Sequence, residues 1–409
     1  MRILVYGINT SPDLTGIGKY TGEMNEYLAG QGHKVTMLTA HPYYPEWELH
    51  PDYPRFFWKK EYVNGVKVFR CPLYIPHHPT ALRKIIHEFS FIMSSMPIWA
   101  GLMVSKKYDY VLVINPPFHL TAYTLVYKWI KGAKLISHVQ DLQVDVVKDM
   151  ELIRNKLFLK IMFKVEKFLF DKSDWVSTIS QGMEKKIANK GIPKSKQLIF
   201  PNWVDCDFIR PLSKEESLRK EFGLSATDKV VLYSGNLGEK QGLEMILDLA
   251  LAFEVDKQVK FVIVGSGGAK KRLESLAIEM GLDNTFFFPL QAYEDLPRLL
   301  AVADVHLVLQ KKEASDLVMP SKLTGIFSAG GLALITAGPG TTLFEVVEKH
   351  KMGILVNPGE PAELYEGLVK ALNDESAQIY KSNARVYAVS NLGKESVLSG
   401  FEHFLENHA

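Results

Sequence analysis

Two apolar segments with the same layout constrain the fold of this 409-residue chain more than any other feature. RILVYGIN (2–9) and KVVLYSGN (229–236) each begin with a basic residue, continue through apolar positions that include a tyrosine, and end in a turn with Gly and Asn. Apolar runs that lead into such a turn are typical of strands buried on both faces of a parallel sheet. The repetition predicts two sheets of the same kind, one in each half of the chain.

Further apolar runs follow in both halves at the spacing expected of βαβ units. They lie at 34–39, 109–114, 133–138 and 174–179 in the first half, and at 260–265, 304–309, 332–336 and 353–356 in the second. Segments with a helical period of 3.6 residues, such as 242–254, separate them. The pattern predicts an α/β protein of two doubly wound, Rossmann-like domains, whose ligands bind beyond the carboxyl ends of the strands.

The domain boundary is expected near FPNWVDCDFIRPL (200–212), where Pro, Asn and Asp interrupt the periodic segments. The chain is also too long for one ordinary hydrophobic core. The predicted organisation is a first domain at 1–205, a second domain at 206–390 and a C-terminal helix at 391–409.

The composition is typical of a folded globular protein without a cysteine-based metal site. The chain is 47% hydrophobic and 23% charged, as in a folded globular protein, and Cys71 and Cys206 have no metal-ligand spacing. The opening residues read as a strand and not as a signal peptide, so we expect a cytoplasmic protein without disulfides. Residues 1–205 carry 27 Lys and Arg against 18 Asp and Glu, whereas 206–409 carry 21 against 28. This asymmetry suggests different partners for the two halves, and no nucleic acid is expected among them.

The first glycine-rich turn follows the opening strand. In TGIGKYTGEM (15–24), the spacing of Gly16, Gly18 and Gly22 differs by one residue from that of the dinucleotide-binding fingerprint. The second strand also lacks the acidic residue that this fingerprint requires at its end. A dehydrogenase is therefore disfavoured. Two interpretations stay open: Gly16 and Gly18 let the backbone approach a ligand at a helix N-terminus, or they are plain turn glycines.

Two turns in the second half combine glycine with a cation. SGNLGEKQGLE (234–244) places Gly235, Asn236 and Lys240 just before a helix. MPSKL (319–323) puts Ser321 and Lys322 in the first helical turn that follows Pro320. A cation beside free backbone N–H groups suits a diphosphate, so both turns are expected to bind one.

The order of these motifs across nearly the whole chain resembles the family 4 retaining glycosyltransferases of GT-B fold, especially the colanic-acid and exopolysaccharide branch. The matching segments are YGINTSPDLTGIGKYTGEM, HVQDLQVD, STISQGM, FPNWVD, LYSGNLGEKQGLE, FFFPLQAYEDLPRLLAVADVHLVLQKK, MPSKLTGIFSAGG and GILVNPGEPAEL. The resemblance implies two Rossmann-like domains facing a cleft, with a C-terminal helix that crosses back to the first domain.

The resemblance also implies a nucleotide-sugar donor held by the second domain and an acceptor held by the first. No cofactor or metal is expected, because cationic side chains and helix N-termini offset the diphosphate charge. Asn236 stands where the broad family usually has an arginine, and Leu317 and Gly325 stand where it has glutamates. Asp316 and Glu345 are therefore expected to contribute to donor binding in their place.

His138 and Asp141 follow the apolar run at 133–138, so we expect them at a strand end facing the cleft. In the family, this neighbourhood approaches the donor sugar and the acceptor, which makes both residues candidate catalytic groups. A histidine that is only structural is the alternative interpretation.

The first half also carries a candidate membrane surface. LIRNKLFLKIMFKVEKFLFDK (152–172) spaces lysines and apolar residues as in a basic interfacial helix. The apolar stretch at 89–104 is 16 residues long, short of the ~20 needed to span a bilayer. Helices that simply pack on the core are the alternative for both segments.

Together these features predict a retaining, metal-independent hexosyltransferase. By resemblance it moves a sugar, fucose being the candidate, from a nucleotide sugar such as GDP-fucose to a lipid-diphosphate-linked oligosaccharide at the inner face of a membrane. Two alternatives stay open: a nucleotide-sugar epimerase of the same architecture, and a non-catalytic nucleotide-sugar-binding subunit.

Overall fold

The computed structural model describes residues 1–13, 16–149, 155–238, 242–310, 321–373 and 376–409. They form two compact units, Met1–Asn202 together with Leu398–Ala409, and Trp203–Val397. The last residues of the chain thus complete the first unit. Cys71 and Cys206 are both free.

The first unit is built on an eight-stranded sheet in the order β3-β4-β2-β1-β5-β6-β7-β8. Its strands are β1 (Arg2–Tyr6), β2 (Lys34–Ala40), β3 (Lys59–Val63), β4 (Val66–Cys71), β5 (Tyr110–Asn115), β6 (Lys134–Val139), β7 (Trp175–Thr178) and β8 (Gln197–Ile199). All neighbours are parallel except β3 and β4, which form an antiparallel hairpin at one edge. The apolar runs predicted in this half are confirmed as strands. The hairpin and β8 were missed because β3 is a half-exposed edge strand rich in charge and β8 is very short.

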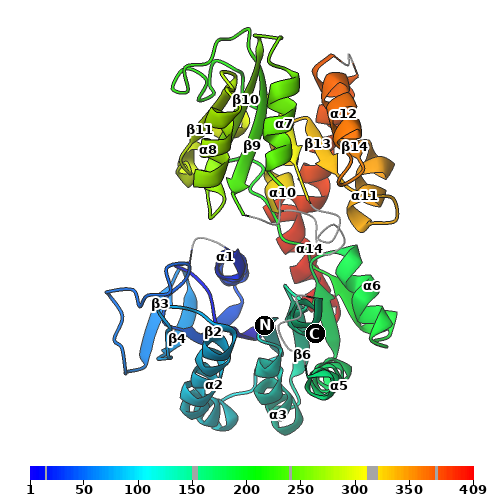
Figure 1. The fold of residues 1–409 in the computed structure, drawn as a ribbon. Coiled ribbons are helices and arrows are strands. Elements are labelled where there is room, and N and C mark those ends of the chain that lie inside the picture. The colour runs from blue at the N-terminus through cyan, green and yellow to red at the C-terminus, as the bar shows by residue number, and fades with distance from the viewer. Residues whose placement is uncertain (14–15, 150–154, 239–241, 311–320, 374–375) are drawn as a thin grey trace. The chain divides into compact units, whose positions relative to one another are not determined.

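Helices of the first unit pack on the sheet through alternate strand residues. The helices are α1 (Gly16–Gly30), α2 (Ala81–Val104), α3 (Thr121–Lys131), α4 (Gln143–Asp149), α5 (Lys156–Lys172) and α6 (Gln181–Asn189). Leu4 and Tyr6 of β1 pack in one cluster with Phe91 and Trp99 of α2 and with Leu169 of α5. Helices α2, α3 and α5 lie side by side along one face of this sheet, with α3 in contact with both neighbours (Figure 1). No helix among the described ranges is long and apolar enough to cross a membrane.

The C-terminal helix α14 (Lys394–Asn407) ends on the first unit. Its Glu402 accepts hydrogen bonds from Tyr27 Oη at 3.2 Å and from His33 Nε2 at 2.9 Å. Phe401 stacks on Phe200 with ring centroids 4.1 Å apart. Both polar and aromatic contacts therefore hold this helix to the unit in which the chain began.

The second unit contains a six-stranded, fully parallel sheet in the order β11-β10-β9-β12-β13-β14. Its strands are β9 (Lys229–Asn236), β10 (Val259–Ser266), β11 (Thr285–Phe288), β12 (Val305–Val308), β13 (Ala333–Thr336) and β14 (Ile354–Val356). Its helices are α7 (Glu244–Ala252), α8 (Lys270–Glu279), α9 (Leu296–Leu300), α10 (Ser321–Ser328), α11 (Thr342–His350), α12 (Pro361–Asn373) and α13 (Ala377–Tyr387). The predicted second doubly wound domain is thus confirmed, and β11 is the strand that the sequence pattern did not reveal.

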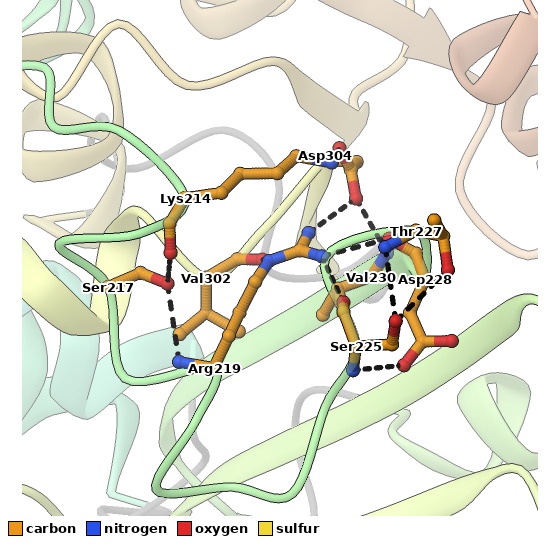
Figure 2. Close-up of polar contacts among 9 residues, drawn as sticks. All are labelled: Lys214, Ser217, Arg219, Ser225, Thr227, Asp228, Val230, Val302 and Asp304. Carbon is orange, nitrogen blue, oxygen red and sulfur yellow. Dashed lines mark hydrogen bonds and ion pairs between the residues drawn. The ribbon is translucent and has the colours of Figure 1, made fainter.

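A buried arginine ties the segment before β9 to the amino end of this sheet (Figure 2). Arg219 donates to the carbonyl oxygens of Val302, Ser225 and Asp228 at 2.9–3.0 Å, and to Asp304 Oδ2 at 2.7 Å. The same carboxylate accepts from Val230 N at 2.8 Å and pairs with Lys214. Removing Arg219 alone would leave these carbonyl oxygens and part of the Asp304 charge without a donor, so its loss is expected to destabilise the unit.

Candidate active site

The loop after β9 lies at the carboxyl end of the second sheet, where ligands of such sheets bind. Gly235 has a φ of +136°, and a Cβ on Gly265 would lie 1.9 Å from the Gly235 carbonyl oxygen. A Cβ on Gly267 would come within 2.4 Å of the Leu237 carbonyl oxygen. The loops after β9 and β10 are therefore in backbone contact that only glycine permits. Asn236, the last residue of β9, is exposed beside this contact.

Lys322 projects from the first turn of α10 toward the same loop. Its Nζ lies 3.8 Å from the centroid of the Tyr233 ring, and a Cβ on Gly235 would be 3.6 Å from it. This ammonium is buried and has no hydrogen-bond partner among the described residues. Burial lowers the pKa of Lys322 to about 8. A buried cation without an anionic partner is unfavourable, so the site is suited to receive an anion.

Tyr233 supplies the surface on which this ammonium rests, and sequence analysis treated it only as a core residue of a strand. Its hydroxyl donates to the Asn236 carbonyl oxygen at 3.0 Å, which holds the ring at the strand end. The ring face attracts the cation by a cation–π interaction and offsets part of its desolvation. The one signal in the sequence was that the strand in each half carries a tyrosine near its end.

The other residues predicted at the donor site divide into three groups. Glu345 is exposed in the first turn of α11, a helix whose N-cap Thr341 accepts from Phe344 N at 3.2 Å. Ser321 begins α10, but its side chain lies outside the described residues. Lys240 and Asp316 lie outside the described residues altogether.

The two glycines predicted to approach the donor from the first unit differ in role. Gly16 opens α1 with a φ of +58°, is exposed, and has open space where a Cβ would be. Gly18 is buried, and a Cβ on it would lie 2.5 Å from the Cβ of Asp13. The absence of a side chain at Gly18 therefore makes room for Asp13, and its approach to a donor stays a prediction.

The ring of His138 is buried, whereas we expected it to be accessible at the end of its strand. It is 2% exposed; its Nδ1 lies 2.8 Å from Ser177 Oγ, and its Nε2 lies 2.9 Å from Gln140 Nε2. Burial lowers the pKa of His138 to about 3, so the imidazole is neutral and both ring nitrogens are engaged. As placed, His138 positions Gln140, whereas Asp141 is exposed at the start of the following loop.

Two carboxyl groups at the carboxyl end of the first sheet have pKa values raised by burial, to about 6 for Asp13 and about 7 for Glu88. Asp13 Oδ2 accepts from Asn9 Nδ2 at 3.0 Å, and Glu88 Oε1 accepts from Gln143 Nε2 at 3.1 Å. His119 Nε2 is 3.7 Å from Glu88, but burial lowers its pKa to about 4, so this contact is not an ion pair near neutral pH. Glu88 was not predicted from the sequence; its only signal is that it is the one acidic residue of α2.

Two parallel-sheet units, with a glycine-lined loop and a buried lysine at the carboxyl end of the second, define the chain as a glycosyltransferase of GT-B fold. Residues 15–203 match the Glycosyl transferase 4-like domain, and residues 214–387 match Glycosyl transferases group 1. The chain belongs to this family. It is 39% identical, over 98% of each chain, to the "Putative colanic acid biosynthesis glycosyl transferase WcaI" of Escherichia coli (strain K12).

Solved structures of low identity share the fold. Sucrose-phosphate synthase from Thermosynechococcus elongatus has a TM-score of 0.76 at 17% identity and covers 100% of this chain and 98% of its own. HepE of Anabaena in complex with UDP has a TM-score of 0.71 at 15% identity and covers 100% of both chains. The two family matches and the relative at 39% identity favour glycosyl transfer over the epimerase and binding-subunit alternatives.

Proposed function

We propose that this glycosyltransferase moves a hexose from a nucleotide sugar to a lipid-diphosphate-linked oligosaccharide during assembly of a colanic-acid-like exopolysaccharide. Fucose from GDP-fucose is the proposed donor sugar. The observation that carries the proposal is the buried Lys322 ammonium over Tyr233, which has no partner among the described residues. The pathway follows from the name of the relative that is 39% identical over nearly the full length.

In this proposal Lys322 binds the diphosphate of the donor at the N-terminal end of α10, where the helix dipole favours an anion. A single ammonium in a site of low dielectric offsets negative charge far more effectively than one in water. Transfer therefore proceeds without a metal ion. Asn236 and Glu345 are proposed to contact the donor from the neighbouring loop and from α11, and Gly16 to approach it from the first unit.

The proposed reaction retains the configuration of the transferred sugar. The acceptor hydroxyl oxygen forms the new bond to the anomeric carbon on the face from which the diphosphate departs. The bond to the diphosphate breaks, and a diphosphate oxygen takes the hydroxyl proton. Lys322 stabilises the charge that develops on the leaving group. His138 acts as a positioning residue through Gln140, and Asp141 is proposed to contact a sugar hydroxyl.

We further propose that the first unit binds the membrane that carries the acceptor, at the inner face. Helix α5 buries Glu166, Leu169 and Phe170 against the unit and leaves a second apolar stripe exposed. That stripe consists of Leu157, Phe158, Ile161, Val165 and Phe168. Lysines at 156, 160, 164 and 167 flank it, as in helices that lie in the interface of an anionic bilayer.

Thermal unfolding with GDP, UDP and their sugar derivatives tests the donor site, with magnesium or with a chelator. A nucleotide that binds the native state must raise the melting temperature. We expect one base to give the larger shift, and the shift to be the same with and without metal. Lys271→Ala, at an exposed lysine of α8, is the control for Lys322→Ala. No shift with any nucleotide would refute the donor site, and a shift that needs magnesium would refute metal-free binding.

A further inference from the structure

A cavity of about 1040 Å³ opens within the first unit, beside the first half of α2. Its walls come from three segments that are separate in the sequence: the loop 47–56, the segment 72–78 that follows β4, and α2. The Trp58 Nε1 hydrogen bond to the Ser94 carbonyl oxygen, at 2.7 Å, and that of Tyr74 N to Ser90 Oγ, at 2.8 Å, hold these segments together. The cavity is therefore a built part of the unit, and none of the predicted site residues lines it.

The floor of the cavity offers a hydrogen-bond acceptor. His41 is 1% exposed, and its Nε2 lies 2.9 Å from the Phe57 carbonyl oxygen. A carbonyl oxygen only accepts, so Nε2 carries the hydrogen and Nδ1 has a free lone pair. That Nδ1 is buried with no partner among the described residues, and burial lowers the pKa of His41. A neutral imidazole with a free acceptor suits a hydroxyl group of a ligand.

The rim is mainly cationic. Arg55 and Arg83 line the cavity, and Arg83 is held in place by its hydrogen bond to the His78 carbonyl oxygen at 3.3 Å. His77 and His78 also line it, and Glu48 is the acidic residue of the lining. Neither arginine has a carboxylate partner among the residues described, so both guanidinium groups are available to an anion. Guanidinium groups match phosphate oxygens in geometry as well as in charge.

An apolar surface continues from the rim along α2. Arg83 and Ser90 are seven residues apart, so both lie on the side of the helix that faces the cavity. Beside them, the first four turns of the same helix carry an exposed apolar stripe. It consists of Leu82, Ile85, Ile86, Phe89, Met93 and Met96, with Phe56, Phe57 and Trp58 exposed nearby. A ligand in the cavity with an apolar tail would lay that tail on this stripe.

We infer that this cavity binds the headgroup of an isoprenyl-diphosphate-linked sugar. Arg55 and Arg83 contact the diphosphate, His41 Nδ1 accepts from a sugar hydroxyl, and the lipid chain runs along the exposed stripe of α2 into the membrane. The inference rests on the proposed function, because it names the acceptor class and the place where the acceptor is held. In this inference the membrane-facing surface of the first unit includes α2 as well as α5.

Farnesyl diphosphate, inorganic diphosphate and farnesol are the three probes, each titrated into the full-length protein with Trp47 and Trp58 fluorescence as the readout. Trp47 lines the cavity, and Trp58 follows the lining residue Phe56 by two positions and bonds α2 through Ser94. We expect farnesyl diphosphate to bind more tightly than either fragment. The double variant Arg55→Gln/Arg83→Gln should weaken it by roughly ten- to hundredfold. Lys106→Gln/Lys107→Gln, which removes the same charge from the residues after α2, should leave binding unchanged.

If inorganic diphosphate binds as tightly as farnesyl diphosphate, the lipid chain contributes no affinity and its proposed place on α2 is wrong. If farnesol binds as tightly as farnesyl diphosphate, the proposed binding of the diphosphate by the arginines is wrong. Ile86→Gln, on the exposed stripe, should lower the preference for farnesyl diphosphate over inorganic diphosphate; an unchanged preference would show that α2 does not hold the chain. The nucleotide-induced thermal shift is measured on the same samples. If the double variant Arg55→Gln/Arg83→Gln binds farnesyl diphosphate as tightly as the wild type while the nucleotide-induced shift persists, this inference fails and the proposed donor function stands.

Discussion

Replacing Lys322 by Met tests the donor site most sharply, because the structure predicts opposite effects on stability and on binding. Met keeps an unbranched apolar side chain that is one atom shorter, and it removes the charged Nζ that lies over Tyr233. Burial holds the pKa of Lys322 at about 8, against an ordinary value of 10.5, so the charged form costs at most about 3 kcal/mol at pH 7. Without ligand, Lys322→Met should therefore be more stable than the wild type, by up to about 5–10 °C in melting temperature.

Nucleotide binding should show the reverse. A hydrogen bond to a charged group contributes about 1.5–3 kcal/mol, so loss of the ammonium should weaken nucleotide diphosphate binding by roughly ten- to hundredfold. The melting temperature of the variant should then respond little to nucleotide. Differential scanning fluorimetry over a nucleotide titration measures both effects in one experiment.

The pH dependence gives an independent check. The folded-state pKa of Lys322 lies below the unfolded value, so the unfolded chain binds more protons between about pH 8 and pH 10.5. The wild type should therefore gain stability from this residue as the pH rises through that window, and Lys322→Met should not. A variant that is less stable at pH 7 and still responds fully to nucleotide would refute the reasoning.

Three further predictions concern stability and site geometry. Arg219→Met should cost about 1–3 kcal/mol in urea unfolding, because three carbonyl oxygens and Asp304 lose a charged donor while Asp304 keeps Lys214; no loss would show that the network is dispensable. Gly265→Ala should cost about 1–3 kcal/mol and reduce the nucleotide shift, whereas Gly268→Ala, with open space around its Cβ, should do neither. Burial raises the Glu88 pKa from 4.5 to about 7, so this residue should cost the wild type up to about 3 kcal/mol as the pH rises through that range; in pH-resolved denaturation Glu88→Gln should remove this contribution and leave that of Asp13.

The fold was largely predictable because its strands are buried on both faces. Strand β5 is buried at every residue and is apolar except at its last residue, Asn115, so its apolar run is visible in the sequence without knowledge of its neighbours. Strand β3 could not be predicted in this way. It is an edge strand with alternate residues exposed, so its sequence KKEYV carries no apolar run, and its pairing with β4 decides its structure.

Some features of the candidate site could likewise be predicted from the sequence, and others could not. The sequence by itself determined that a lysine stands in the first turn of a helix after a buried strand, because helix and strand patterns are local. Only the tertiary structure decided that this ammonium lies over Tyr233 without a partner among the described residues, that His138 is enclosed, and that Gly18 accommodates Asp13. Burial, pKa shifts and unpaired charge depend on atoms brought together from distant parts of the chain, and no local pattern encodes them.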